Sequence, residues 1–187
     1  MSKLTLSITA CLCITGASLA EDITVGGPDS DYKRIQDAID AASDGDNILV
    51  EPGTYMENIG FLGKDIAVIS TGGLGAAMIM PKWEGYPVVT IENGSWDAEL
   101  DGFVIQGGSN TLNGGIGGGI QIENAGPTIR ECLLIQNEAA YGGGIGVIGD
   151  GGACAPLIED CTFDDNYAEV SGGGIYYTSN IKQPTGL

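Results

Sequence analysis

The 187-residue sequence contains no histidine, and this absence removes whole classes of chemistry. Ser-His-Asp and Cys-His nucleophile systems, histidine zinc sites and imidazole acid–base catalysis all need that side chain. An enzyme with this sequence would have to work without any of them.

Basic residues are scarce as well. The chain has 7 lysines and arginines against 25 aspartates and glutamates. A surface this acidic repels the phosphate backbone, so we do not expect nucleic acid to be a partner. The same field repels polyanionic sugars such as pectate or alginate unless a divalent cation lies between protein and sugar.

A long apolar run occurs only at the N-terminus. Lys3, the apolar stretch 4–19 and the small residues Ser18 and Ala20 predict a signal peptide over residues 1–20. A lipoprotein cleavage box ending at Cys11 and a buried N-terminal helix are the alternatives. No later segment approaches the ~20 apolar residues of a membrane helix. We therefore expect an exported chain of residues 21–187 that does not span the membrane and lies outside the cell, on its outer surface or in the periplasm.

Repetition is the strongest positive signal. Three similar strand segments begin at Leu100, Ile129 and Ile158, so that the offset is 29 residues twice in succession. A glycine run ending in isoleucine follows each equivalent bend, at residues 117–120, 142–145 and 172–175. A unit of this length cannot bury its apolar face alone, so successive units must stack. The sequence predicts an all-β solenoid, a right-handed parallel β-helix.

This stacking also explains the residues at the bends. Gly108, Asn137 and Asn166 share one position of the repeat, where side-chain amides can hydrogen-bond along the axis. The glycines lie where the backbone turns with positive φ.

One helix is expected before the coils. Apolar residues at helical spacing from Ile35 to Ala42 predict a capping helix over about 31–43, with Asp29, Ser30 or Asp31 as its N-cap. The β-helix domain is 21–187 and its coils span about 46–180, with early strands in 46–55 and 66–70.

The segments 32–42, 45–55 and 63–66 resemble the N-terminal cap and first coils of the pectin-lyase-like β-helix superfamily. The glycine runs, together with Phe163-Asp164-Asp165-Asn166, look like the repeats of polymorphic outer-membrane proteins. The resemblance covers nearly all of residues 30–180. It implies the fold but no single function, because the superfamily includes polysaccharide lyases, hydrolases, esterases and non-catalytic adhesins.

Acidic pairs are the candidates for a calcium-dependent lyase site. Such lyases bind Ca²⁺ through carboxylates and use a lysine or arginine as base, which makes Arg130 the candidate base. The candidate calcium ligands are Glu159, Asp160, Asp164 and Asp165. The alternative is structural, because the register places Asp101, Arg130 and Glu159 in one column whose charges balance. Those partners would also keep Arg130 protonated, the wrong state for a base.

Three cysteines remain in the mature chain, which is an odd number. Cys132 and Cys161 occupy equivalent inward positions, about 4.8 Å apart if they lie on neighbouring strands. A disulfide is within reach, but parallel Cβ vectors favour stacked free thiols. We expect Cys154 to be exposed.

Aromatic residues support a binding function. The register places Thr90, Gln121, Gly146 and Tyr176 in one outward column, with Tyr177 pointing inward. Trp83, Tyr86 and Trp96 fall in the turns around that column, where exposed rings suit sugar stacking. In the alternative, the tryptophans fold over the turns and cover a hydrophobic edge.

Two functional classes remain. The first is a secreted or surface-associated, non-catalytic module that binds a polysaccharide or a surface protein; the second is a calcium-dependent lyase of acidic polysaccharide. Because the coil that opens at residue 172 does not close before residue 187, we also expect the chain to be a piece of a longer β-helix.

Overall fold

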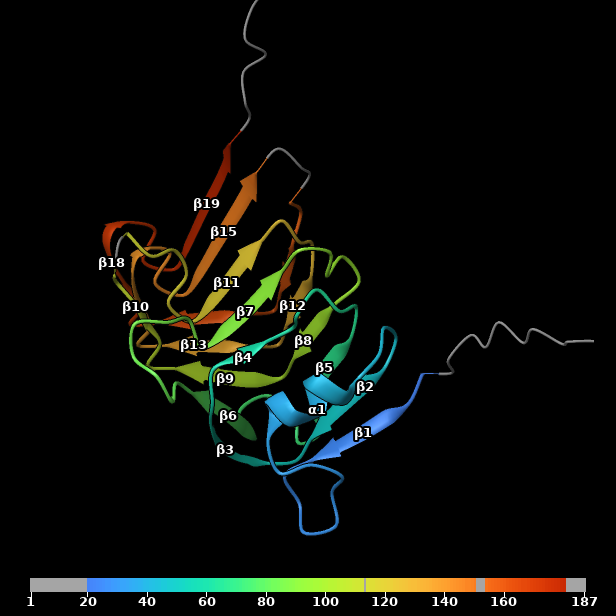
Figure 1. The fold of residues 1–187 in the computed structure, drawn as a ribbon. Helices are drawn as coiled ribbons and strands as arrows, with labels where there is room; N and C mark the ends of the chain where they lie inside the picture. Colours follow the sequence, from blue (N-terminus) through green and yellow to red (C-terminus); the bar gives the residue numbers. More distant parts are fainter. Residues whose placement is uncertain (1–19, 113, 151–153, 181–187) are drawn as a thin grey trace, which may run out of the picture.

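The computed structural model describes residues 20–112, 114–150 and 154–180. They form a parallel β-solenoid whose axis runs from the N-terminal strand at the bottom of Figure 1 to the C-terminal strand at the top. The predicted signal peptide lies outside the described residues, apart from Ala20. Within the described ranges, no helix has the length and apolar character needed to cross a bilayer.

Every successive coil adds one strand to each of three main parallel sheets. Sheet A contains, in spatial order, β1 (Asp22–Val25), β2 (Asn47–Val50), β5 (Ala67–Ser70), β8 (Glu99–Asp101), β12 (Thr128–Arg130) and β16 (Leu157–Glu159). Sheet B contains β3 (Gly53–Met56), β6 (Ala77–Met80), β9 (Phe103–Gln106), β13 (Leu133–Ile135) and β17 (Thr162–Asp164).

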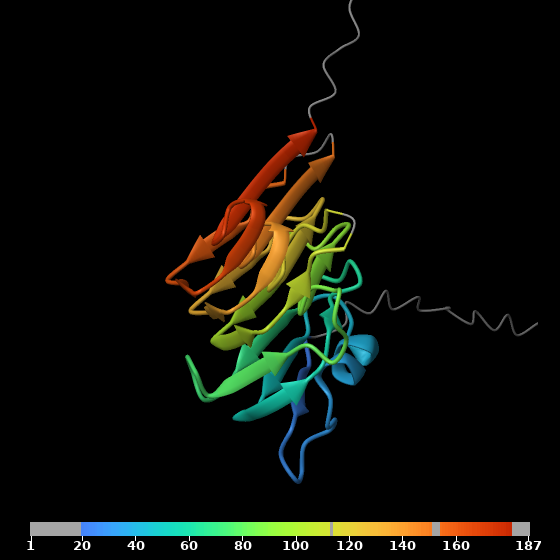
Figure 2. The ribbon, with the colours of Figure 1, turned by 90° about the vertical axis from the view of Figure 1, so that its left-hand side faces the viewer.

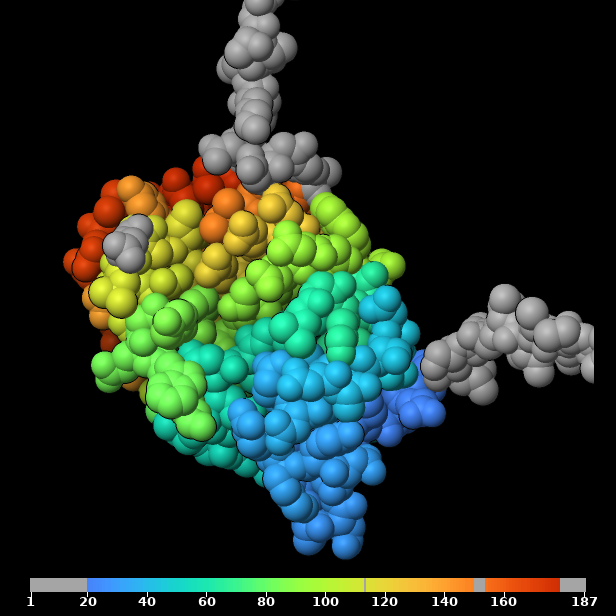
Figure 3. Space-filling view, in the orientation of Figure 1, coloured from blue at the N-terminus to red at the C-terminus, as the bar shows by residue number. Residues whose placement is uncertain are grey.

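Sheet C contains β4 (Ile59–Gly60), β7 (Val89–Glu92), β11 (Ile120–Glu123), β15 (Ile145–Asp150) and β19 (Ile175–Asn180). The later coils add a short sheet D of β10 (Ser109–Asn110), β14 (Glu138–Tyr141) and β18 (Tyr167–Ser171). The side view in Figure 2 and the successive colour bands in Figure 3 show the coils stacked from blue to red.

The core is a set of apolar columns inside the solenoid. In sheet A the column is Ile48, Val68, Leu100, Ile129 and Ile158. All but Ile158 are fully buried or nearly so, and each contributes roughly 1.5–3 kcal/mol of burial free energy. The 29-residue register of the sequence is thus confirmed, because Leu100, Ile129 and Ile158 are direct strand partners.

In the last described coil, side chains at inward positions are exposed to solvent. Ile175 and Tyr177 continue the buried columns of Ile145 and Val147, yet they are 44% and 53% exposed. Tyr177 therefore has the inward register that we expected, while its ring is half exposed.

Glycine runs stack with almost no space between their backbones. The first glycine of each run has positive φ, as predicted, with values of +77°, +66° and +74° at Gly117, Gly142 and Gly172. The glycines that follow are needed because the backbone of a neighbouring coil comes very close to them. A Cβ added at Gly143 would lie 2.2 Å from the Tyr167 carbonyl oxygen and 2.8 Å from that of Gly173. No other residue type fits there without moving a coil.

The predicted asparagine ladder is present. Asn137 Oδ1 accepts a hydrogen bond from Gly108 N at 2.9 Å, and Asn166 Oδ1 accepts one from Asn137 N at 3.0 Å. Asn137 Nδ2 also donates to Ile105 O at 3.0 Å, so its amide satisfies backbone groups at a bend where Asn137 is fully buried.

The helix α1 (Ile35–Ala41) is shorter than the predicted 31–43, and it follows the strand β1 rather than preceding all the coils. Ile35 and Ile39 are buried against the core. Its N-terminus receives no side-chain cap from Asp29, Ser30 or Asp31. The buried Glu57 carboxylate instead accepts hydrogen bonds from Ile35 N and Gln36 N at 3.0 and 3.1 Å. The cap comes from the next coil, which local sequence patterns do not reveal.

Helix α1 also lies beside the edge strand β4 (Figure 1). The Gln36 amide pairs with Gly60, accepting from its N–H at 2.8 Å and donating to its carbonyl at 3.3 Å. A side chain thus satisfies backbone groups that a further strand would otherwise pair.

Candidate functional site

The turn between β6 and β7 forms a hollow on the outer surface of sheet C, which we call the turn pocket. Its volume is about 320 Å³, and it is lined by Asn58, Ile59, Gly60, Trp83, Tyr86, Pro87 and Thr90. The side chains of Trp83 and Tyr86 are 61% and 63% exposed, unusually high fractions for large aromatic rings. The pocket therefore combines two accessible rings with an uncharged, mainly apolar floor.

The Asn58 side chain holds the turn that forms one wall of this pocket. Asn58 Oδ1 accepts from the backbone N–H groups of Lys82 and Trp83 at 3.0 and 2.8 Å. Asn58 Nδ2 donates to the carbonyls of Trp83 and Pro87 at 3.4 and 2.8 Å. The amide thus holds both ends of the turn and has no remaining capacity for a ligand.

Sequence reasoning missed Asn58, although a signal existed. Asn58 stands two residues after Met56, as Asn137 stands two residues after Ile135, and both strand ends belong to one column of sheet B. The early coils depart from the 29-residue period, because the offset in sheet A is 20 residues from Ile48 to Val68 and 32 residues from Val68 to Leu100. This change of period hid the equivalence.

A second hollow lies on the other side of the turn. It has a volume of about 330 Å³ and is lined by Glu84, Gly85, Ser109, Thr111 and Leu112. Leu112 is 66% exposed and approaches the backbone of Gly85, where an added Cβ would lie 3.0 Å from Leu112 Cδ1. The turn is thus a ridge between two depressions.

The predicted outward column is in register, but it is not one open surface. Thr90, Gln121, Gly146 and Tyr176 are successive strand partners, as expected. The loop before β11 covers the middle, because a Cβ at Gly146 would lie 2.3 Å from Gly117 N and 2.5 Å from Ile116 Cγ2.

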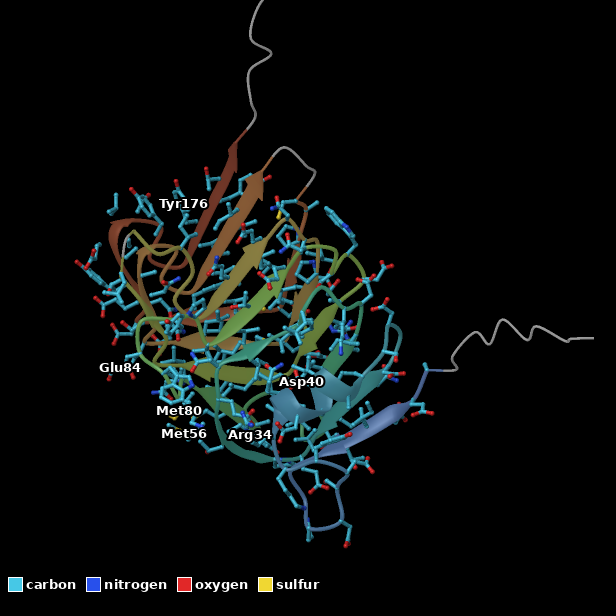
Figure 4. All side chains as sticks on the ribbon, in the orientation of Figure 1. Arg34, Asp40, Met56, Met80, Glu84 and Tyr176 are labelled. Carbon is cyan, nitrogen blue, oxygen red and sulfur yellow. The ribbon has the colours of Figure 1, made fainter. Side chains whose placement is uncertain are left out.

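Tyr176 packs on Tyr141, with 4.9 Å between the ring centroids, and Figure 4 places it far from Glu84 of the turn. Only two of the five predicted binding residues line the turn pocket, namely Trp83 and Thr90; the other three are Gln121, Tyr176 and Trp96.

Trp96 lies in the turn at the opposite end of β7. Its side chain is 48% exposed, and its ring covers Gly126 of the next coil, where an added Cβ would lie 2.9 Å from Trp96 Cε3. The sequence left open whether the tryptophans stack against sugars or cover a hydrophobic edge. The covering role describes Trp96 better than Trp83.

Arg130 is held as a cation. It forms ion pairs with Glu99 and Asp101, the latter at 3.0 Å. The hydrogen bond that Arg130 donates to Asp101, reinforced by the charge of Glu99, raises the pKa of Arg130 above its ordinary value. The guanidinium cannot act as a general base in this state.

The strand pairing expected between Arg130 and Glu159 is present, but the expected ion pair is not among those of the described residues. The two residues are strand partners, but no described ion pair joins them. Glu99 and Asp101 both project from the outer face of β8, so the preceding coil offers two carboxylates where the following coil offers one.

The four predicted calcium ligands do not form a metal site in the described residues. No group of three or more described carboxylate or cysteine side chains there could hold a metal ion. Glu159, Asp160, Asp164 and Asp165 are all exposed. Asp160 and Asp165 have φ of +49° and +51°, a left-handed turn conformation that aspartate tolerates well.

The cysteines are free, as expected for the stacked pair. The pKa of the Cys161 thiol is lowered to about 7, first because Cys132 donates a hydrogen bond to it, while burial opposes this. Cys132 is fully buried, and donating that hydrogen bond together with burial raises its pKa. The exposure predicted for Cys154 is wrong. It is only 5% exposed, and its Sγ donates to the Ala125 carbonyl at 2.8 Å.

A third hollow, of about 510 Å³, lies beside β1 and is acidic. Its carboxylates serve the fold. Asp46 accepts from Glu21 N and Ser43 N at 2.9 and 2.8 Å, and these bonds lower its pKa. Asp31 accepts from Thr24 in the same way.

Comparison with known proteins supports the fold. No family model matches the chain. A cell surface glycoprotein of Methanothermus fervidus is 30% identical over 142 residues, which is 73% of this chain and 21% of that protein. The chain thus spans about a fifth of the length of this relative.

Among solved structures, an alginate lyase of family PL6 is 18% identical, with a TM-score of 0.53 over 78% of this chain and 20% of the lyase. A pectin methylesterase from Aspergillus niger is 15% identical, with a TM-score of 0.38 over 87% of each chain. The likeness to the lyase concerns the fold alone. The chain has the pectin-lyase-like parallel β-helix fold that its sequence indicated, while the likeness to polymorphic outer-membrane repeats stays a prediction.

Proposed function

We propose that this chain belongs to a surface-associated β-helix protein that binds glycans, without catalysis, at the turn pocket. The observation that carries the proposal is the exposure of Trp83 and Tyr86 at the rim of a hollow with an uncharged floor. Exposed rings held by a rigid scaffold are suited to stacking against sugar rings. The name of the Methanothermus relative, a cell surface glycoprotein, agrees with a place at the cell surface.

The described residues give little support to lyase chemistry. A β-eliminating site needs a base opposite a cation that stabilises the developing enolate. The candidate base, Arg130, is paired with two carboxylates, and its pKa is raised. We therefore expect no release of unsaturated product from polygalacturonate or alginate, with or without Ca²⁺, as followed by absorbance at 235 nm.

The binding proposal is tested with the tryptophans, which supply a matched pair. A glycan array would identify ligands, and calorimetry would then compare the wild-type chain with Trp83→Ala and Trp96→Ala. We expect Trp83→Ala to weaken binding about tenfold or more, which corresponds to ~1.4 kcal/mol, and Trp96→Ala to leave it unchanged. Equal affinity of the wild-type and Trp83→Ala chains would refute the site. Capture of proteins but no glycan on parallel arrays would instead favour a protein partner.

A further inference from the structure

The polar groups that the turn pocket offers to a ligand are all uncharged. Because Asn58 is used by the turn, the available groups are the hydroxyls of Thr90 and Tyr86 and the indole N–H of Trp83. No described hydrogen bond occupies these three groups. Hydroxyls and an indole match the hydroxyls of a sugar, but none of them can neutralise a carboxylate.

The charges around the pocket are mainly negative. Glu84 belongs to the turn itself, and Glu92 projects from β7 two residues beyond Thr90, about 7 Å along the strand. Glu123 is the strand partner of Glu92, so two carboxylates lie side by side on the same face. A uronate bound at Thr90 would lie within about one Debye length of this acidic group.

Nearly all described cations are committed elsewhere. Lys33 donates to the carbonyls of Gly27 and Pro28, Lys64 donates to three carbonyls at the end of α1, and Arg34 and Arg130 are in ion pairs. Lys82 is the exception within the described ranges. Its ammonium lies 5.2 Å from the centroid of the Trp83 ring, a cation–π arrangement.

From these charges we infer that the ligand of the turn pocket is an uncharged glycan and not a polyuronate. This inference rests on the proposed function and adds the chemical class of the ligand. Two rings provide stacking, three neutral groups provide hydrogen bonds, and the carboxylates exclude acidic chains at long range. Lys82 does not line the pocket, and its ammonium rests near the Trp83 ring without recruiting an anion.

The test uses one polymer in two charge states. Oligogalacturonides of equal length, methyl-esterified or de-esterified, are titrated into the chain in EDTA, together with neutral mannan, xylan and cellulose oligosaccharides. We expect at least one neutral ligand to bind and the ester to bind at least tenfold more tightly than the acid. Added salt should narrow that ratio by screening the repulsion. Trp83→Ala should abolish neutral binding, while Lys82→Gln should change it less than threefold.

The outcomes separate the inference from the proposed function. The acid could bind as tightly as the ester or more tightly, and this binding could be lost in both Trp83→Ala and Lys82→Gln. That result would support the turn pocket as the binding site but would overturn the inference that its ligand is uncharged. The failure of every glycan to bind would overturn the proposed function itself. Binding of a neutral glycan that is unaffected by Trp83→Ala would place it outside the turn pocket and overturn both.

Discussion

The later coils, from β8 to β19, and the early coils, from β2 to β7, solve the same stacking problem differently. The later coils turn through glycine runs and an asparagine ladder, and the glycine backbones leave no space for a Cβ. The early coils have no such run, and the turn between β6 and β7 is held at both ends by the Asn58 side chain. The regular region is constrained by its backbone, so the exposed aromatic pocket occurs where the repeat is irregular.

The largest expected effect comes from filling the glycine stack. Gly143→Ala should destabilise the chain by about 3 kcal/mol, because its Cβ would meet the carbonyls of Tyr167 and Gly173. Gly53→Ala is the control, since its Cβ would meet only the Tyr55 ring, at 3.6 Å. Urea unfolding measures both. Equal midpoints for the two variants would remove the proposed constraint on the later coils.

The second largest effect on stability is expected at the asparagine ladder. Asn137→Ala should cost about 2 kcal/mol, because Gly108 N and Ile105 O would lose their partner inside the core. Asn47→Ala, which removes only an exposed bond to Asp22, should cost less than about 0.5 kcal/mol. If the two variants lower the urea midpoint by similar amounts, the buried ladder stabilises the fold no more than an exposed hydrogen bond does.

A smaller effect is expected at the charge column. Arg130→Glu should lower the melting temperature by about 2 °C, because a third carboxylate would face Glu99 and Asp101. Differential scanning calorimetry at low salt measures it, and 0.5 M NaCl should reduce the difference. An unchanged melting temperature at low salt would show that these pairs do not couple the coils.

The smallest effect on folding concerns the thiols. The Cys161 thiolate should become reactive as the pH rises through about 7, since its pKa is lowered to that value. Iodoacetamide labelling at pH 5–9, followed by mass spectrometry, measures the midpoint. Cys132→Ala removes the donated hydrogen bond and should move this midpoint upward. A wild-type midpoint near the ordinary thiol value of about 8.5 would contradict the contact between the two cysteines.

Among the candidate site residues, the strand register was predicted correctly and the tryptophans lie in turns as expected, but the sequence did not reveal which turn side chains meet at a pocket. The alignment of Thr90 with Gln121 and Tyr176 needed only the strand register, which repetition reveals. The strand register could not show that Ile116 covers Gly146, because the path of a loop depends on its contacts with other coils. The exposure of Trp83 and the burial of Cys154 were decided in the same way.

By itself, the sequence determined that this protein is a parallel solenoid, which apolar columns enter the core and which bends carry asparagine and glycine. These features repeat, and a repeat that must stack on itself has only one register that buries its apolar face. Only the tertiary structure decided that Glu57 caps α1 and that Asn58 closes the turn pocket. Both side chains act on residues 21 to 29 positions away, across the gap between coils, where no local pattern records the contact.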